Sequence, residues 1–463
     1  MKTFQLFNSD DIESRRKNLL NSDVKTNNSN LKSYLSQFND VLDIGSSDIL
    51  SEIREGIMSD DEDLILSQLS KASLLFVSGV STIPKPDTDF YHRLIYLSSN
   101  SNSLVAQQSV LLLLNLLIFF PEEQNNFLKR ELIQIIIHHA SEDETIAKLC
   151  DFLKKYPSYI SLFYENNLFE QLLSVLTQKD DIYTYNSSLR LLTMISELTQ
   201  TKENPPIGIE FSHQIFGITK DHALNYSKYT APTLKYYRSV LPEIFDDVIN
   251  SGIFQFLIEN TISFNFPTLE ASILLISNAV NESTVQFFLE SNLISLIHAI
   301  FCQENTKSIE YNFILLYNLA MSSEIGSICQ TEEPVSTDII SHMSDSFNCR
   351  VYSTKLFLEL IKYKKREEMI RFLGREENEF LINMVELLQL EFDPTIIPIL
   401  EMFLDYAQKS QIGKHPLFEK FEICMQSEEF SNALDNVMSY HQDDEDVQRA
   451  VEIAEEICKI IES

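Results

Sequence analysis

A chain of 463 residues with 44% hydrophobic residues can bury a large core, and its 9 Gly and 13 Pro leave few of the turns that many short strands require. The composition therefore predicts an all-α fold. A formal net charge of −32 argues against a nucleic-acid partner and favours attraction of basic ligands. The six cysteines include no C-x-x-C pair, so neither a zinc ribbon nor a disulfide scaffold is indicated.

Residues 1–45 are rich in Asn, Ser and Asp, and we predict a flexible N-terminal arm. Its one basic cluster is Arg15, Arg16 and Lys17. The residues after Met1 do not form a continuous apolar run, and no stretch reaches the roughly 17 to 25 apolar residues of a membrane span. We therefore expect a protein of the cytoplasm and nucleus that contacts no membrane.

Helical periodicity starts at Asp48 and continues almost to the end of the chain. The apolar run 110–120 predicts a buried helix that Pro121 ends, with Asn115 as a polar residue inside it. A buried amide must be hydrogen-bonded or meet a ligand, so the position of Asn115 needs an explanation.

A unit of 40 to 43 residues recurs along the chain. Short apolar helices are predicted directly after Asn167, Gly252 and Asn292, and Asn and Gly are residues that tolerate the left-handed turn between helices. Units of this length are typical of armadillo and HEAT repeats.

The second apolar helix of each unit carries a hydrogen-bonding residue at an equivalent position, in steps of 36, 42, 43, 42, 40 and 41 residues. We predict that these residues form a ladder on the concave surface, where solenoids bind extended partners. The alternative is that the side chains cap neighbouring backbone. The positions are Asn115, Asp151, Thr193, Tyr236, Asn278, Asn318 and Glu359.

Three stretches of the chain resemble the importin-α family in their order and spacing. Residues 53–64 resemble the opening of its armadillo array, and residues 432–453 resemble its final, atypical repeat. The third stretch, residues 204–207, follows the helix that carries Thr193. The resemblance implies an armadillo-repeat right-handed superhelix of about nine to ten repeats. Residues 46–408 would form the array and residues 409–463 the atypical C-terminal repeat.

In importin-α, groove asparagines bind the backbone of a basic peptide and tryptophans hold the aliphatic stems of its side chains. By register, Asn115, Asn278 and Asn318 match the asparagines, and Tyr236 falls where the family tends to have tyrosine. This chain has no Trp, and Lys155 stands near a position where the family has an acid. The tryptophan positions are occupied by Leu111, Ala147, Leu189, Leu274 and Ile314.

The resemblance implies a nuclear import adaptor that binds extended basic segments of cargo in its groove. It also implies that Arg15, Arg16 and Lys17 of the arm bind importin-β, and that an export receptor is a further partner. The alternative is an armadillo scaffold that has lost recognition of nuclear localisation signals.

No sequence pattern indicates an enzyme. The chain contains no glycine-rich phosphate loop, no G-x-S-x-G elbow and no H-E-x-x-H motif. His138 and His139 are adjacent, so on a helix they point about 100° apart and cannot share a metal ion as histidines at i and i+4 can. We therefore expect no cofactor, no metal and no small-molecule substrate.

Overall fold

The computed structural model describes residues 46–77, 85–178, 181–201, 206–225, 227–303, 305–323, 335–363, 380–390, 395–410, 416–440 and 444–461. These residues form helices joined by short turns, and none of them lies in a strand. The chain divides into two compact units, Met1–His139 and Ala140–Ser463, which we describe separately. The predicted arm cluster of Arg15, Arg16 and Lys17 lies outside the described residues.

The first unit packs α4 against both α3 and α6, and α5 against α6. Its elements are α3 (Ser46–Ile57), α4 (Glu62–Val77), α5 (Thr88–Leu97), α6 (Ser103–Phe119), the 3₁₀ turn η1 (Pro121–Glu123), α7 (Gln124–Phe127) and α8 (Arg130–His138).

Helix α6 is the buried helix predicted from the sequence. The Asn102 side chain accepts hydrogen bonds from two backbone N–H groups at its start, and Pro121 follows its end. Asn115, however, is half-buried and lies on the exposed side of α6, so no buried amide has to be explained. No single helix among the described residues is long and apolar enough to cross a membrane, although α6 and the following Pro121–Phe127 segment, bent by 110°, reach that length together.

The second unit is also built from helices, which differ in length. Its elements are α9 (Asp143–Lys155), η2 (Pro157–Tyr159), α10 (Ile160–Glu165), α11 (Leu168–Gln178), α12 (Ile182–Thr199), η3 (Ile209–Phe211), α13 (Ser212–Asn225), α14 (Ser227–Ser239), α15 (Leu241–Asn250), α16 (Ile253–Asn260), η4 (Thr261–Ser263), α17 (Phe266–Ala279), α18 (Val285–Glu290), α19 (Leu293–Phe301), α20 (Thr306–Ser322), α22 (Val335–His342), α23 (Phe347–Tyr363), α25 (Phe380–Leu388), α26 (Ile396–Ser410), α27 (Pro416–Met425), α28 (Glu428–Met438) and α29 (Glu445–Ile461).

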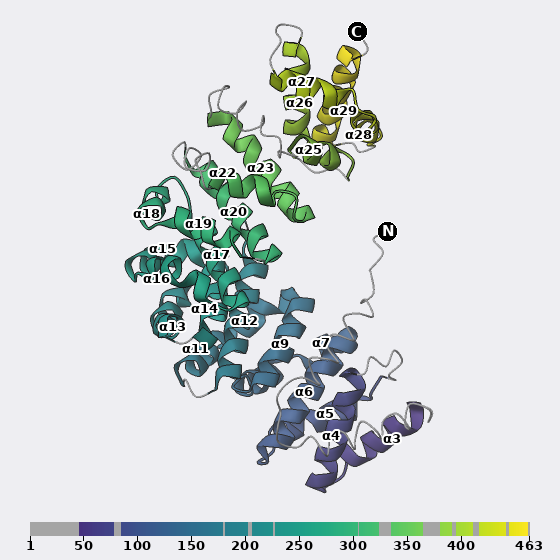
Figure 1. Cartoon of the computed structure of the whole chain (residues 1–463). Helices are drawn as coiled ribbons and strands as arrows, with labels where there is room; N and C mark the ends of the chain where they lie inside the picture. The colour runs from purple at the N-terminus through teal and green to yellow at the C-terminus, as the bar shows by residue number, and fades with distance from the viewer. Residues whose placement is uncertain are drawn as a thin grey trace. The chain divides into compact units, whose positions relative to one another are not determined.

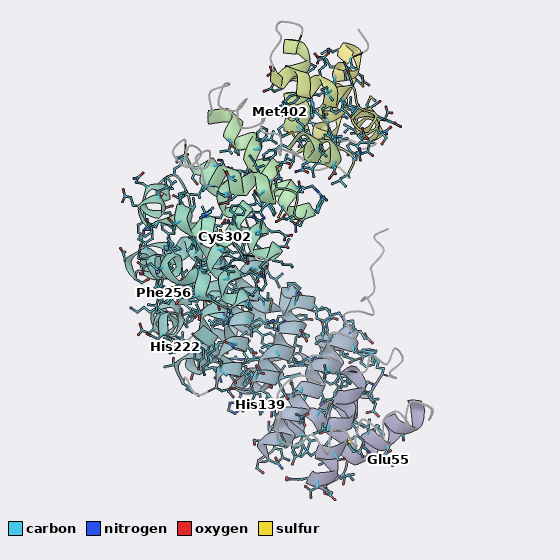
Figure 2. All side chains as sticks on the ribbon, viewed as in Figure 1. Glu55, His139, His222, Phe256, Cys302 and Met402 are labelled. Carbon is cyan, nitrogen blue, oxygen red and sulfur yellow. The ribbon has the colours of Figure 1, made fainter. Side chains whose placement is uncertain are left out.

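Two layers run through this unit (Figure 1). Helices α9, α12, α14, α17, α20 and α23 pack on one another in that order, and we call them the row helices. Helices α11, α13, α15, α16, α19 and α22 form a second layer, which we call the outer layer. His222 on α13 and Phe256 on α16, both labelled in Figure 2, lie in the outer layer.

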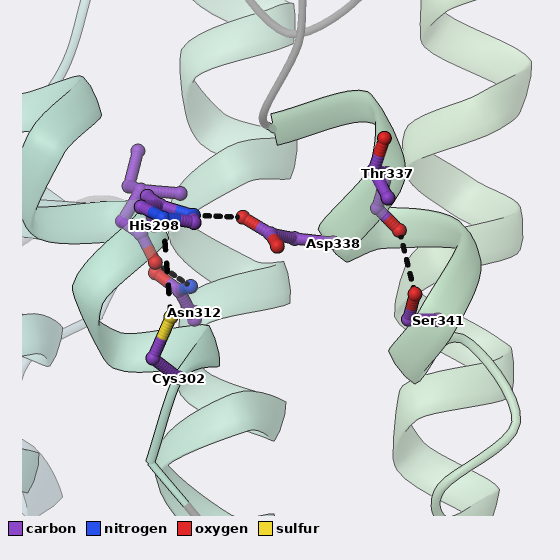
Figure 3. A network of polar contacts seen from close by, with 7 residues as sticks. His298, Cys302, Asn312, Thr337, Asp338 and Ser341 are labelled. Atoms are coloured by element: carbon purple, nitrogen blue, oxygen red, sulfur yellow. Dashed lines mark hydrogen bonds and ion pairs between the residues drawn. The ribbon is translucent and has the colours of Figure 1, made fainter.

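Side-chain hydrogen bonds join residues about one repeat apart, which confirms the predicted period. His298 Nδ1 lies 2.6 Å from Asp338 Oδ2, a separation of 40 residues along the chain (Figure 3). The Tyr311 hydroxyl donates to Glu270 Oε1 at 2.7 Å, across 41 residues. Equivalent side chains of successive 40-residue repeats therefore lie next to one another.

The predicted left-handed turns are also present. The φ angles are 72° at Asn167, 77° at Gly252 and 63° at Asn292, and a short helix begins at the next residue in each case. These residue types adopt positive φ at low cost, so the sequence placed the three turns correctly.

The row helices share a second repeated polar position, which lies in the core and which the sequence prediction missed. Each of the six row helices carries a fully buried Ser, Thr or Asn, five or six residues before the predicted ladder position. Small hydroxyl side chains let neighbouring helices approach closely, and Ser188 and Ser272 donate to the carbonyl four residues earlier, at 2.8 and 2.7 Å. The positions are Thr145, Ser188, Thr230, Ser272, Asn312 and Thr354.

Candidate functional site

Two of the predicted ladder residues line one surface hollow of about 860 Å³. Asn278 comes from the last turn of α17 and Asn318 from the last two turns of α20. The other side of the hollow is formed by the ends of α12 and α14 and by the first turns of α15. We call this site the carboxylate hollow, because the acidic residues Glu243, Asp246 and Glu282 line it.

The carboxylate hollow favours positive charge for two reasons. First, three carboxylates face a single guanidinium, that of Arg238, which already lies 3.5 Å from the carboxylate of Glu197. Second, α12, α14, α17 and α20 all end at the hollow, and each helix carboxyl end carries roughly half a negative charge. The one helix that begins there, α15, opposes only part of this field.

Glu243 is the residue that most clearly points to a ligand. Its Oε2 atom is buried and has no hydrogen-bond partner among the described residues. A buried carboxylate oxygen without a donor is costly, on the order of 1 to 3 kcal/mol. Glu243 as a whole is half-buried, and a cationic group bound beside its carboxylate would reduce that cost.

The two asparagines differ in exposure and in their hydrogen bonds. Asn278 is exposed. Asn318 is half-buried, and its Nδ2 donates to the Ser277 carbonyl at 2.9 Å and to the Ser277 hydroxyl at 2.8 Å. Nδ2 of Asn318 thus caps the backbone of α17, as in the capping alternative, and its Oδ1 is the group left to accept a hydrogen bond from a ligand.

The remaining ladder positions lie elsewhere. Asn115 belongs to the first unit. Asp151 is exposed on α9, with Oδ2 3.4 Å from Lys148 Nζ. Thr193 donates to the Leu189 carbonyl of its own helix at 2.8 Å, which is the capping alternative, and Glu359 is half-buried on α23.

The prediction that Tyr236 lines the groove is wrong. Its side chain is only 2% exposed, and burial raises its pKa. The neighbouring Lys235 is exposed instead. Adjacent helical residues point about 100° apart, so a register error of one residue exchanges a surface position for a core position.

The positions taken from the tryptophan array also differ in exposure. Leu189 is completely buried and Leu111 is 8% exposed, whereas Ala147, Leu274 and Ile314 are half-buried. Leu189 therefore offers no surface to the stem of a bound side chain.

His138 and His139 line a second hollow, of about 610 Å³, in the first unit. His138 ends α8 and His139 caps it, with His139 Nε2 3.1 Å from the Ser98 carbonyl oxygen. The part of the chain that the structure describes contains no group of three His, Cys, Asp or Glu side chains that could hold a metal ion.

Comparison with known proteins adds information on the fold. No protein-family model matches the chain. No curated protein matches it either.

Solved structures do match. An engineered protein superposes with a TM-score of 0.59 at 10% identity, over 90% of this chain and 99% of that one. A chain from a study of a phosphorylation switch in the interaction between cadherin and beta-catenin gives 0.50 at 13% identity, over 89% and 93%. Importin beta gives 0.53 at 10% identity, over 89% of this chain and 57% of that one. At these identities the matches show the fold alone, and it is an all-α armadillo-type solenoid.

Proposed function

We propose that this protein is a peptide-binding solenoid, and that it holds an extended segment of a partner protein across α14, α17 and α20 with a basic side chain of the segment in the carboxylate hollow. The unpaired carboxylate oxygen of Glu243, buried in a hollow where four helices end, is the observation that carries the proposal.

Each group in the hollow has a part in this binding. A Lys or Arg head donates to Glu243, with Asp246 and Glu282 adding charge around it. The amides of Asn278 and Asn318 bind the backbone of the segment, which gives affinity without strong sequence preference. The exposed Met321 at the rim covers the aliphatic stem of the basic residue.

The test uses a labelled 12-residue peptide with two central lysines, a second peptide with glutamines in their place, and fluorescence anisotropy with the full chain. We expect the lysine peptide to bind at least about tenfold more tightly, because a charge-assisted hydrogen bond contributes about 1.5 to 3 kcal/mol. Glu243→Gln combined with Glu282→Gln removes this preference. Glu170→Gln, an exposed glutamate in the first turn of α11 in the outer layer, is the matched control and leaves the preference intact. Equal affinity for the two peptides would overturn the proposal.

The resemblance to importin-α favours nuclear import as the cellular role of this peptide binding. In this role the protein takes basic nuclear localisation segments as cargo, moves between cytoplasm and nucleus, and binds importin-β through Arg15, Arg16 and Lys17 and an export receptor elsewhere. The carboxylate hollow supports the cargo part of this proposal. A pull-down with the full chain tests the rest: recovery of importin-β that is lost in an Arg15→Ala/Arg16→Ala/Lys17→Ala variant supports the adaptor.

A protein-interaction scaffold outside transport is the second candidate. It is favoured by the absence of Trp and by the burial of Leu189, because these leave α12 without the slot that grips a basic residue. Recovery of other partners without importin-β in the same pull-down favours the scaffold.

A further inference from the structure

The row helices carry a concentration of positive charge that the composition does not suggest. The chain has 68 Asp and Glu against 36 Lys and Arg. Helix α14 nevertheless contains Lys228, Lys235 and Arg238 and no acidic residue. Its neighbours in the row add Arg190 on α12 and Lys154 at the end of α9.

Four of these five basic residues have no acidic partner among the described residues. Lys154, Arg190, Lys228 and Lys235 are exposed, and no carboxylate within the described part of the chain lies within ion-pair distance of them. Arg238 differs, because it lies beside Glu197, and Lys148 on α9 lies beside Asp151. In so acidic a chain, unpaired bases on three adjacent helices are unexpected. We call these four residues the basic surface.

The four residues lie on a continuous part of the row. Helix α9 packs on α12, and α12 packs on α14. Lys228 and Lys235 are seven residues apart, which places them on the same face of α14 about two turns apart. Burial raises the pKa of the Cys150 thiol, and Arg190 and Lys154 both lie close enough to lower it, with Asp151 nearby acting in the opposite direction.

The negative charge elsewhere on the chain does not cancel this surface. At physiological ionic strength, interactions between exposed charges are screened beyond about 8 Å. A ligand on the basic surface therefore experiences mainly these four bases and their nearest neighbours. Acidic segments are repelled from the rest of the protein, so the basic surface is also the place where repulsion is least.

We propose that the basic surface binds an extended acidic segment of a partner protein. Neighbouring packed helices lie about 8 to 10 Å apart, and an extended chain of the polyproline II type advances about 3.1 Å per residue with three residues per turn. Acidic residues three positions apart in such a segment lie on one side of it and about 9 Å apart, so they meet bases on successive row helices. A peptide fits better than a nucleic acid, because a polyanion with a charge at every residue would extend beyond the four bases onto the acidic surface around them, whereas a few carboxylates need only local complementarity.

This site is separate from the carboxylate hollow and needs no ligand there. Arg238 is the one basic residue of α14 that lines the hollow, and it is not part of the basic surface. Variants of the two sites can therefore be tested independently.

The test measures binding of a labelled peptide with Asp or Glu at every third position to the full chain, against a peptide with Asn and Gln in their place. We expect the acidic peptide to bind more tightly and to lose that preference as salt is raised from 50 to 500 mM. Arg190→Glu combined with Lys235→Glu should weaken it about tenfold, since two attractions become two repulsions. Lys220→Glu on α13 of the outer layer, where the lysine is half-buried, makes the same change of charge away from the basic surface and leaves binding unchanged.

Circular dichroism of each variant checks that the fold is retained, and Arg190→Gln with Lys235→Gln provides a milder second variant. The same variants are titrated with the lysine peptide, whose binding should not fall. Equal binding of the acidic and neutral peptides, tighter binding of a single-stranded oligonucleotide than of the acidic peptide, or an equal loss in the Lys220→Glu control would overturn the proposal.

Discussion

Glu243→Gln should stabilise the unbound protein while it weakens binding of the lysine peptide. Two effects oppose each other in the unbound state. The unpaired, buried Oε2 of Glu243 costs about 1 to 3 kcal/mol, and an uncharged amide reduces that cost. Glu243 also lies in the first turn of α15, where a negative charge stabilises the helix by about 0.3 to 1 kcal/mol.

The burial cost is the larger of the two, so we expect a net gain of about 1 kcal/mol in the free energy of unfolding. Urea denaturation followed by circular dichroism measures it, with the midpoint compared at constant m-value. Glu170→Gln is again the control: its glutamate is exposed in the first turn of α11, so only the helix effect remains and the protein should lose a few tenths of a kcal/mol. A Glu243→Gln variant that is less stable than the wild type, by as much as the control or more, would refute the reasoning, because the carboxylate would then be serving the fold and not a ligand.

Three further predictions follow from the packing. Gly208→Ala should destabilise the fold by more than about 2 kcal/mol in urea denaturation, because φ is 81° and the new Cβ would lie 2.0 Å from Phe169 Cε1. Gly252→Ala, at φ 77° with open space around it, should cost only about 1 kcal/mol, and equal losses in the two variants would contradict this explanation. Ser272→Leu should lower the free energy of unfolding by about 1 to 3 kcal/mol, because it overpacks α17 against its neighbours, whereas Ser272→Ala should change it little. An unchanged stability of the leucine variant would mean that the row helices are not closely packed there. Iodoacetamide at pH 8 should alkylate the exposed Cys302, whose Sγ lies 3.9 Å from His298 Nε2, well before Cys349 and Cys424. Burial raises the pKa of both of these thiols to about 11, which leaves only about one thiolate in a thousand. Peptide mapping by mass spectrometry checks the order, and equal rates at the three cysteines would contradict it.

The fold was largely predictable because it depends on local signals that repeat. Asn167, Gly252 and Asn292 marked left-handed turns, since few other residues tolerate positive φ, and each turn is present. The 40-residue period was visible in apolar residues, and hydrogen bonds such as His298 to Asp338 now show its physical basis. Ser272 and its equivalents follow the same period and could have been found by the same count.

The carboxylate hollow was only half predictable. Asn278 and Asn318 lie on row helices at the expected step, so the period found them. Glu243, Asp246 and Glu282 lie on α15 and after α17, outside that period, and only folding brings them to the same hollow. Tyr236 was misplaced because an α-helix has no integral number of residues per turn, and a count of whole repeats does not fix which of two neighbours faces outward.

The most direct test of the peptide-binding proposal is photo-crosslinking with the lysine peptide, carrying a benzophenone side chain beside one lysine. The account predicts crosslinks to residues around the carboxylate hollow, above all to the exposed Met321 at its rim, and their loss in Glu243→Gln combined with Glu282→Gln. Crosslinks confined to outer-layer helices such as α16 and α19, unchanged in that variant, would contradict it.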